Sequence, residues 1–112
     1  METLKKQRDF DRVYGQGESC VSRYLVLYWY SNPREEKNNR FGFSISKKVG
    51  KAVVRNKLRR RLKEIIRLNH SRIKPGFDCI FIVRNPAVNL NFHELKKEAI
   101  KLYKKAGLWL EE

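Results

Sequence analysis

Apolar positions along this chain recur with two different periods, and the changes of period divide it into helices and strands. Residues 8–16 carry Phe10 and Val13 at helical spacing and are followed by a glycine, which predicts a first helix. Residues 19–30 are rich in β-branched and aromatic side chains, as a strand buried on at least one face is. The polar segment 32–39 then predicts a turn or hairpin loop.

The second half of the chain continues this alternation. Residues 41–46 alternate apolar with small side chains, which predicts a half-buried strand. Residues 52–69 return to a helical period, and the nearly continuous apolar run at 77–83 is typical of a central strand. A last helix is predicted to begin at a capping box, in which Asn91 is the cap and Glu94 stands three residues on.

This order of elements predicts an α+β fold, with helices packed over a small mixed sheet. The 112 residues suit a single domain, 1–112, that buries a modest core. A hydrophobic content of 41% favours a globular protein over a disordered one. The net charge of +14 repels itself unless a polyanion relieves it, so RNA, DNA or an anionic membrane surface is the expected partner.

The basic residues are concentrated in one window. The chain has no acid between Glu36 and Glu64, and residues 46–63 contain nine lysines and arginines. Val54 and Leu58 belong to an apolar stripe at helical spacing in the same region, so one face of the helix can be buried while the other keeps its charge. A packed stripe behind a cationic face predicts a nucleic-acid-binding helix rather than a solvated tail.

Asn56, Arg60, Lys63 and Arg67 lie on the face opposite this stripe. Most charged helix faces are simply solvated, but those usually mix acids with bases four residues apart. The rarity of acids here favours an RNA or DNA ligand. Asn56 either bridges the helix to a neighbouring loop or reads a base or hydroxyl, and the sequence leaves both alternatives open.

Lys47, Lys48 and Lys51 lie between the strand 41–46 and the basic helix. The segment lacks the GxxxxGK[ST] pattern of nucleotide-hydrolysing loops. A looser prediction remains, in which lysines near a helix amino terminus hold a phosphate group.

Phe10 and Tyr14 are one helical turn apart, and Tyr28 in the following strand is expected to approach them. Aromatic residues at this spacing are usually core residues. The alternative is a platform on which single-stranded bases stack. The residues alone favour the core.

Several other functions find little support in the sequence. The longest apolar run is far shorter than the roughly 20 residues of a membrane-spanning helix, and the amino terminus lacks the apolar segment of a signal peptide, so we expect no membrane and a cytoplasmic protein. Cys20 and Cys79 fall in strand-like segments and are predicted to be reduced core residues, while His70 and His93 complete no metal pattern. No catalytic arrangement and no small-molecule substrate site are predicted.

The segment 42–60, GFSISKKVGKAVVRNKLRR, resembles the protein subunit of bacterial ribonuclease P. The family pattern is a hydrophobic strand followed by KKxGxAVxRNxx[KR]R, and every fixed position is present. Residues 9–14 followed by Gly17 are similar to the family's first helix, and 23–28 to the start of its sheet. The similarity covers most of the chain.

The resemblance implies a two-layer α-β-β-β-α-β-α sandwich with a left-handed βαβ crossover through the basic helix. It implies a protein cofactor of a ribonucleoprotein endonuclease, a hydrolase of tRNA processing that removes the 5′ leader from precursor tRNA. The catalytic RNA subunit would carry the chemistry and, with the substrate, hold the magnesium. The protein would contribute no catalytic residues, would bind the leader between its sheet and first helix, and would support metal binding indirectly.

By position, the resemblance implies that Phe10, Tyr14 and Tyr28 line the leader cleft, which reverses the preference for a core role. The residues that would contact RNA are Lys47, Lys48, Lys51, Arg55, Asn56, Arg59, Arg60, Lys63 and, from the charge pattern, Arg67. The rival interpretation is a structural RNA-binding module, such as a ribosomal protein, with no role in cleavage. A DNA-binding regulator is a third, although no helix-turn-helix pair is evident.

Overall fold

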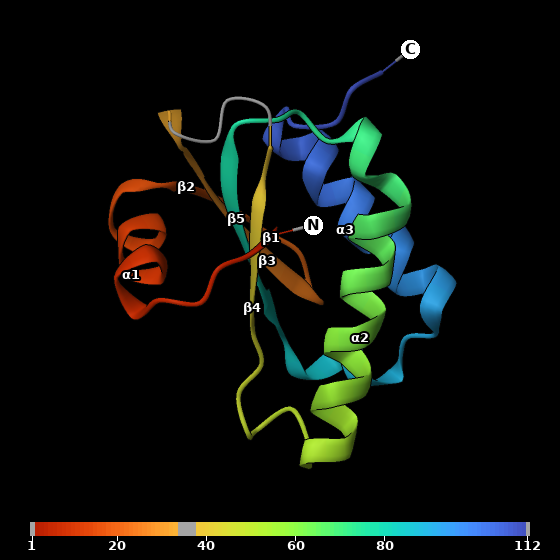
Figure 1. Ribbon diagram of the computed structural model, residues 1–112. Coiled ribbons are helices and arrows are strands. Elements are labelled where there is room, and N and C mark those ends of the chain that lie inside the picture. Colours follow the sequence, from red (N-terminus) through yellow and green to blue (C-terminus); the bar gives the residue numbers. More distant parts are fainter. Residues whose placement is uncertain (1, 34–37, 112) are drawn as a thin grey trace.

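A mixed sheet of five strands forms the centre of the protein in the computed structural model, which describes residues 2–33 and 38–111 (Figure 1). One helix covers one face of this sheet, and two longer helices cover the other. The elements in chain order are β1 (Glu2–Thr3), α1 (Gln7–Gln16), β2 (Glu18–Val21), β3 (Leu25–Ser31), β4 (Arg40–Ser44), α2 (Ala52–Asn69), β5 (Phe77–Val83) and α3 (Phe92–Ala106). Short 3₁₀ turns follow α2 (η2, His70–Arg72) and precede α3 (η3, Asn85–Asn89).

The strands lie in the order β1-β4-β5-β3-β2, so the last strand in the sequence is the middle one in space. β5 pairs antiparallel with β3 and parallel with β4. Parallel neighbours need a crossover, and α2 supplies it between β4 and β5. The apolar run of β5 fits this central position, because the strand is covered on both faces.

α2 and α3 pack side by side against one face of the sheet (Figure 1). The predicted apolar stripe of α2 is buried, with Leu58, Leu62 and Ile65 each at most 3% exposed. From the sheet, Phe81 meets the ring of Tyr103 on α3 edge-on, with centroids 5.4 Å apart. We call this the closed face, because its side chains form the main hydrophobic core.

The predicted capping box opens α3. The side chain of Asn91 accepts the backbone N–H of Glu94, and the Glu94 carboxylate accepts the backbone N–H of Asn91, both at 2.9 Å. Gly107 ends the helix with φ of 77°, a left-handed conformation that favours glycine. The amino- and carboxyl-terminal signals thus define this helix locally.

α1 lies on the opposite face of the sheet, which we call the open face (Figure 1). Val13 of α1 and Ile80 of β5 are fully buried there, and Leu4 beside them is 6% exposed. The aromatic residues around them are only partly buried. One short helix therefore covers this face incompletely, whereas two longer helices cover the other.

Two predictions about the first half of the chain are wrong. Residues 19–30 are not one strand, because the chain turns at Ser22, whose hydroxyl accepts the backbone N–H groups of Tyr24 and Leu25 at 3.2 and 3.1 Å. Of the two alternatives for segment 32–39, the hairpin loop is wrong, because β5 lies between β3 and β4. Residues 34–37 of that segment lie outside the described residues.

The α+β class and the predicted order of helices and longer strands are confirmed, and the two-residue β1 is an addition at the sheet edge. Cys79 is buried and Cys20 half-buried, and both are free thiols. Burial raises the pKa of the Cys79 thiol far above its ordinary value, which keeps it protonated.

Candidate RNA interface

The three aromatic residues expected in a cleft come together on the open face. Phe10 and Tyr14 of α1 have ring centroids 6.4 Å apart, and the ring of Tyr28 on β3 meets Tyr14 edge-on at 5.0 Å. All three side chains are half-buried. They are therefore anchored on the inner side while part of their surface remains accessible, as a stacking platform requires. We call these three residues the aromatic cluster.

Gly42 allows the first helix to approach the sheet this closely. Gly42, Ile80 and Tyr28 are aligned across β4, β5 and β3 and therefore share the open face. A Cβ atom built on Gly42 would lie 2.7 Å from Cζ of Phe10, well inside the contact distance of two carbons. Phe10 thus rests on bare backbone, and any side chain at position 42 would displace its ring.

A polar pair lies beside the aromatic rings. Burial raises the pKa of Tyr14, and a hydrogen bond with the Ser44 hydroxyl on β4 offsets part of the rise. Tyr14 is therefore a neutral phenol at physiological pH. The two hydroxyls place a donor and an acceptor next to a surface that is otherwise aromatic.

An ion-pair network holds the amino-terminal half of α1 on the sheet. Asp78 of β5 is fully buried, and Arg40 of β4 donates to both of its carboxylate oxygens at 2.9 and 2.7 Å. The same guanidinium lies 3.6 Å from the Asp9 carboxylate of α1. Asn32 donates to Asp78 as well, at 3.2 and 3.3 Å. Charge neutralisation therefore orients the helix that carries Phe10 and Tyr14.

The same network bears on whether the protein itself could hold magnesium. Asp9 and Asp78 share one arginine, so their oxygens already serve a cation. Mg²⁺ requires carboxylate oxygens that are open to it and to its waters. In the described part of the chain, no three His, Cys, Asp or Glu side chains are grouped as a metal site. Asp9 and Asp78 therefore do not fit magnesium, because Arg40 already occupies their oxygens.

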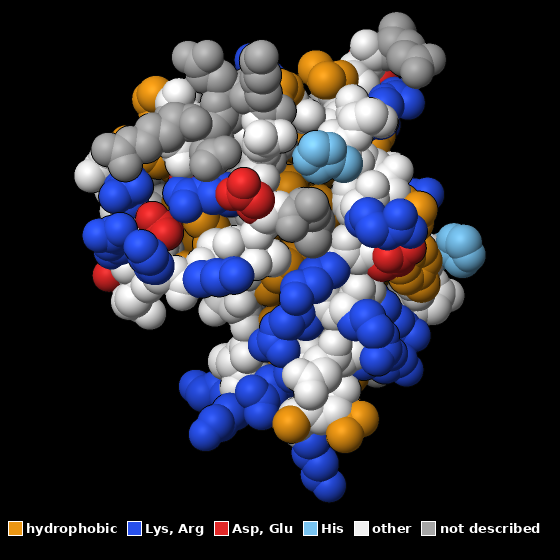
Figure 2. Space-filling view, in the orientation of Figure 1, with side chains coloured by type: hydrophobic (Ala, Val, Ile, Leu, Met, Phe, Trp, Pro, Cys, Tyr) orange, Lys and Arg blue, Asp and Glu red, His pale blue; other side chains and the backbone are white. Residues whose placement is uncertain are grey.

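A second surface is formed by α2 and the loop before it. Lys and Arg side chains spread across the front of the molecule, from the region of α1 to α2 and the loop below it (Figure 2). The predicted residues Lys47, Lys48, Lys51, Asn56, Arg60, Lys63 and Arg67 are all exposed, and Arg55 and Arg59 are half-buried. We call the nine residues together the basic surface.

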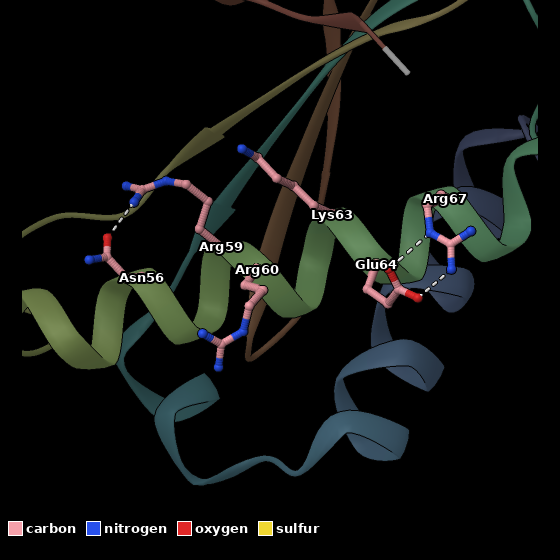
Figure 3. Close-up of a pocket in the computed structure, with 6 residues that line it drawn as sticks. All are labelled: Asn56, Arg59, Arg60, Lys63, Glu64 and Arg67. Atoms are coloured by element: carbon pink, nitrogen blue, oxygen red, sulfur yellow. Dashed lines mark hydrogen bonds and ion pairs between the residues drawn. The ribbon is translucent and has the colours of Figure 1, made fainter.

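Six side chains of α2 line a groove of about 410 Å³ (Figure 3). Arg59 and Lys63 extend from one side of the helix, and Arg60 projects from the other. Asn56 accepts a hydrogen bond from Nη1 of Arg59 at 2.9 Å, so it orients a neighbouring guanidinium on the same helix. Of the two roles left open for Asn56, the bridge to a neighbouring loop is not formed with any residue of 2–33 or 38–111.

Arg67 differs from the rest of the basic surface. Its guanidinium donates to both carboxylate oxygens of Glu64, at 3.0 and 2.6 Å. This pairing lowers the pKa of Glu64 and raises that of Arg67. The carboxyl-terminal end of this helix face is therefore partly neutralised, and any phosphate that approached Arg67 would share its guanidinium with Glu64.

Arg55 links the helix to the preceding loop, because its Nε donates to the backbone carbonyl of Gly50 at 3.1 Å. The loop that carries Lys47, Lys48 and Lys51 is thereby fixed against the first turn of α2. The helix begins without a side-chain cap. Lysines beside free backbone N–H groups are the arrangement predicted for holding a phosphate.

Comparison with known proteins identifies the family. The sequence model of the family Ribonuclease P matches residues 1–107. This chain belongs to the ribonuclease P protein family. Its relatives include the ribonuclease P protein component of Caldanaerobacter subterraneus subsp. tengcongensis, 41% identical over 97% of this chain and 92% of that protein. That of Desulforamulus reducens is 50% identical over 85% of this chain and 82% of the relative.

Solved structures agree with this assignment. The RNase P protein of Staphylococcus aureus superposes with a TM-score of 0.91 at 33% identity, over 97% of this chain and 98% of that one. The RNase P protein of Thermotoga maritima gives a TM-score of 0.84 at 31% identity, over 94% and 97% of the two chains. The fold implied by the ribonuclease P resemblance is therefore confirmed.

In this member of the ribonuclease P protein family, the structure brings the predicted residues together as two groups. The aromatic cluster lies between α1 and the open face of the sheet, and the basic surface lies on α2 and its preceding loop. The sequence alone did not point to Gly42, Ser44 and Arg40, which contact the aromatic cluster or hold α1 on the sheet. Only Gly42 had a local signal, as a glycine inside an apolar strand. Within 2–33 and 38–111, no helix is both long and apolar enough to cross a membrane.

Proposed function

We propose that this chain works as the protein subunit of a bacterial ribonuclease P particle, together with a catalytic RNA subunit and precursor tRNA. As a family member it is the protein cofactor of the endoribonuclease that removes the 5′ leader in tRNA maturation. The proposal also assigns separate roles to the RNA subunit and to the protein. The RNA carries the hydrolytic chemistry, and this protein binds the leader and the RNA.

The aromatic cluster binds the single-stranded leader. Half-buried rings offer π-faces to bases, and each stacked base is worth roughly 1–3 kcal/mol. Mature tRNA lacks the leader, so this contact favours the substrate over the product. The observation that carries the proposal is the meeting of Phe10, Tyr14 and Tyr28 over the bare backbone of Gly42.

The basic surface binds the phosphate backbone of RNA. No carboxylate pairs with Arg60, Lys63 or the three loop lysines among the described residues, so their charge is available to an external polyanion. Arg59, oriented by Asn56, has the planar fork that suits bidentate phosphate contacts. Neutralised phosphates release counterions, which makes the affinity depend steeply on salt.

Magnesium belongs to the RNA subunit and substrate in this proposal. The protein raises the effective affinity of the complex for Mg²⁺ indirectly, by neutralising phosphate repulsion and holding the substrate in place. The cytoplasm is the compartment that the proposal implies, because tRNA precursors are transcribed there in bacteria.

Cleavage at low magnesium tests the proposal. A bacterial ribonuclease P RNA and a precursor tRNA are mixed with and without the full-length protein. We expect leader removal at low Mg²⁺ only with protein, and tighter binding of precursor than of mature tRNA. The same stimulation should persist with Lys74→Gln, which removes one exposed charge outside both surfaces.

An RNA-binding module without a role in cleavage gives a different result. It would bind precursor and mature tRNA equally and would leave the rate of cleavage unchanged. That outcome would overturn the proposal in favour of the rival interpretation.

A further inference from the structure

The exposed side of α3 carries a second set of cations, on a surface that neither the aromatic cluster nor the basic surface includes. The buried stripe of this helix contains Leu95, Ala99 and Leu102. On its other side is a groove of about 430 Å³, lined by His93, Lys96, Lys97, Ile100, Lys101 and Lys104. We call these six residues the lysine face.

The acidic residues of α3 do little to neutralise this face. Glu94 is engaged in the capping box, where its carboxylate accepts the backbone N–H of Asn91. Glu98 pairs with Lys101 at 3.2 Å, and its side chain is only 13% exposed. Lys97 and Lys104 are exposed and have no acidic partner in the described part of the chain. An excess of positive charge therefore faces solvent.

α1 shows what a helix with a solvated polar face is like in the same molecule. There, Asp9 and Asp11 alternate with Arg8 and Arg12, and Arg12 lies 3.7 Å from Asp9. Mixed signs of this kind need no external ligand. The lysine face lacks this compensation, which favours a polyanionic partner over simple solvation.

The spacing of the lysines along α3 suits an anion with regularly repeated charges, such as a phosphate backbone. Lys97 and Lys101 are one turn apart, and Lys101 and Lys104 a further turn, so these lysines are attached to the helix at steps of about 6 and 4.5 Å along its axis. Ile100 is half-buried between them and gives the groove an apolar floor along which lysine stems can lie. A row of point charges over several turns fits a phosphate backbone better than a single small anion.

We propose that the lysine face of α3 is a second RNA-docking surface, which binds the phosphate backbone of double-helical RNA without reading its sequence. Lysines contact phosphates as point charges, and this face contains no arginine, asparagine or glutamine for bidentate contacts to bases. The protein then touches RNA through two separate helix faces and can bridge two RNA segments. This inference does not depend on leader binding or on cleavage.

Lysine acetylation gives a direct test. The full-length protein is treated with an acetylating reagent, with and without a blunt-ended RNA duplex two helical turns long, and modification is read by mass spectrometry. We expect the duplex to slow acetylation of Lys97 and Lys104 several-fold and to leave Lys74 unchanged. Protection of Lys63 on α2 without protection of Lys97 and Lys104 would overturn the proposal.

Charge removal provides a second, independent readout. Lys97→Gln/Lys104→Gln keeps good helix formers on α3 and should lower the slope of log Kobs against log salt by about 1.8, for two duplex phosphates. The matched control Lys5→Gln/Lys74→Gln removes the same charge from exposed sites elsewhere and should change the slope by much less. Equal changes in both variants would show an effect of net charge and contradict the proposal.

The two proposals fail in different ways. If RNA protects the lysine face but the protein never stimulates cleavage, the docking surface is supported and the ribonuclease P function is contradicted. If the protein stimulates cleavage but RNA leaves the lysine face unprotected, the ribonuclease P function is supported and the docking surface is contradicted.

Discussion

The two faces of the sheet differ in how completely helices cover them. On the closed face, α2 and α3 bury Leu27 and Phe81 until they are at most 1% exposed. On the open face, α1 leaves Tyr28 and Phe10 half-buried. Neighbouring residues of one strand, such as Leu27 and Tyr28, therefore lie in very different surroundings.

The difference teaches that incomplete cover produces the candidate binding surface. A stacking platform needs rings that are held in place and still accessible, so the helix above them must be short and close. The Asp9–Arg40–Asp78 network holds α1, and Gly42 lets it approach. A longer or second helix on this face would extend the core and remove the platform.

The largest effect is expected from the closed face. Phe81→Ala removes a fully buried ring that packs on Tyr103, so unfolding in urea should show a loss of about 3–5 kcal/mol. The fraction that remains folded should bind precursor tRNA normally. A selective loss of leader binding with little loss of stability would mean that the two faces are not separate in role.

The close contact between Phe10 and Gly42 can be tested with a single methyl group, that of alanine at position 42. Gly42→Ala should displace the Phe10 ring, destabilise the protein by about 1–3 kcal/mol and weaken precursor binding by about one stacking contact, roughly 1–3 kcal/mol.

Gly15→Ala is the matched control, because nothing lies within 4 Å of the Cβ position at Gly15 on α1. It should leave precursor binding unchanged and stabilise the helix slightly. Equal binding by both variants would show that the position of the Phe10 ring does not matter.

A smaller effect, of opposite sign, is expected at Tyr103. Its hydroxyl is buried on the closed face and has no hydrogen-bond partner among the described residues, so Tyr103→Phe should raise stability by about 1 kcal/mol. Burial raises the pKa of Tyr103 well above its ordinary value of 10.0.

The sign of the pH effect follows from that shift. The unfolded chain ionises this phenol above about pH 10 while the folded protein does not, so the wild type loses stability as pH rises further. Urea unfolding at pH 8 and pH 11 should show a smaller alkaline loss for Tyr103→Phe. An identical pH dependence in both proteins would contradict the burial of this group.

Elements with a local signal could be predicted from the sequence. The apolar stripe of α2, the continuous apolar run of β5 and the capping box of α3 each specify a segment without reference to the rest of the chain. The turn at Ser22 was missed because apolar and aromatic residues continue on both sides of it. The position of β5 between β3 and β4 depends on long-range pairing, which periodicity does not report.

The candidate site was predictable in part for the same reason. Charge patterning located the basic surface, and helical spacing paired Phe10 with Tyr14. The Ser44 hydroxyl, the Arg40 network and the Glu64–Arg67 pair depend on how side chains meet in space. The hypothesis that the aromatic cluster is more than core comes from the resemblance to the ribonuclease P family, because the residues alone favoured a core role.

The central claim is that the aromatic cluster on the open face binds the leader, and the affinities of Phe10→Ala for two tRNAs test it most directly. In the complex with catalytic RNA, the variant should bind precursor tRNA more weakly by about 1–3 kcal/mol and bind mature tRNA as the wild type does. A precursor affinity equal to that of the wild type, or an equal loss for both tRNAs, would contradict the account.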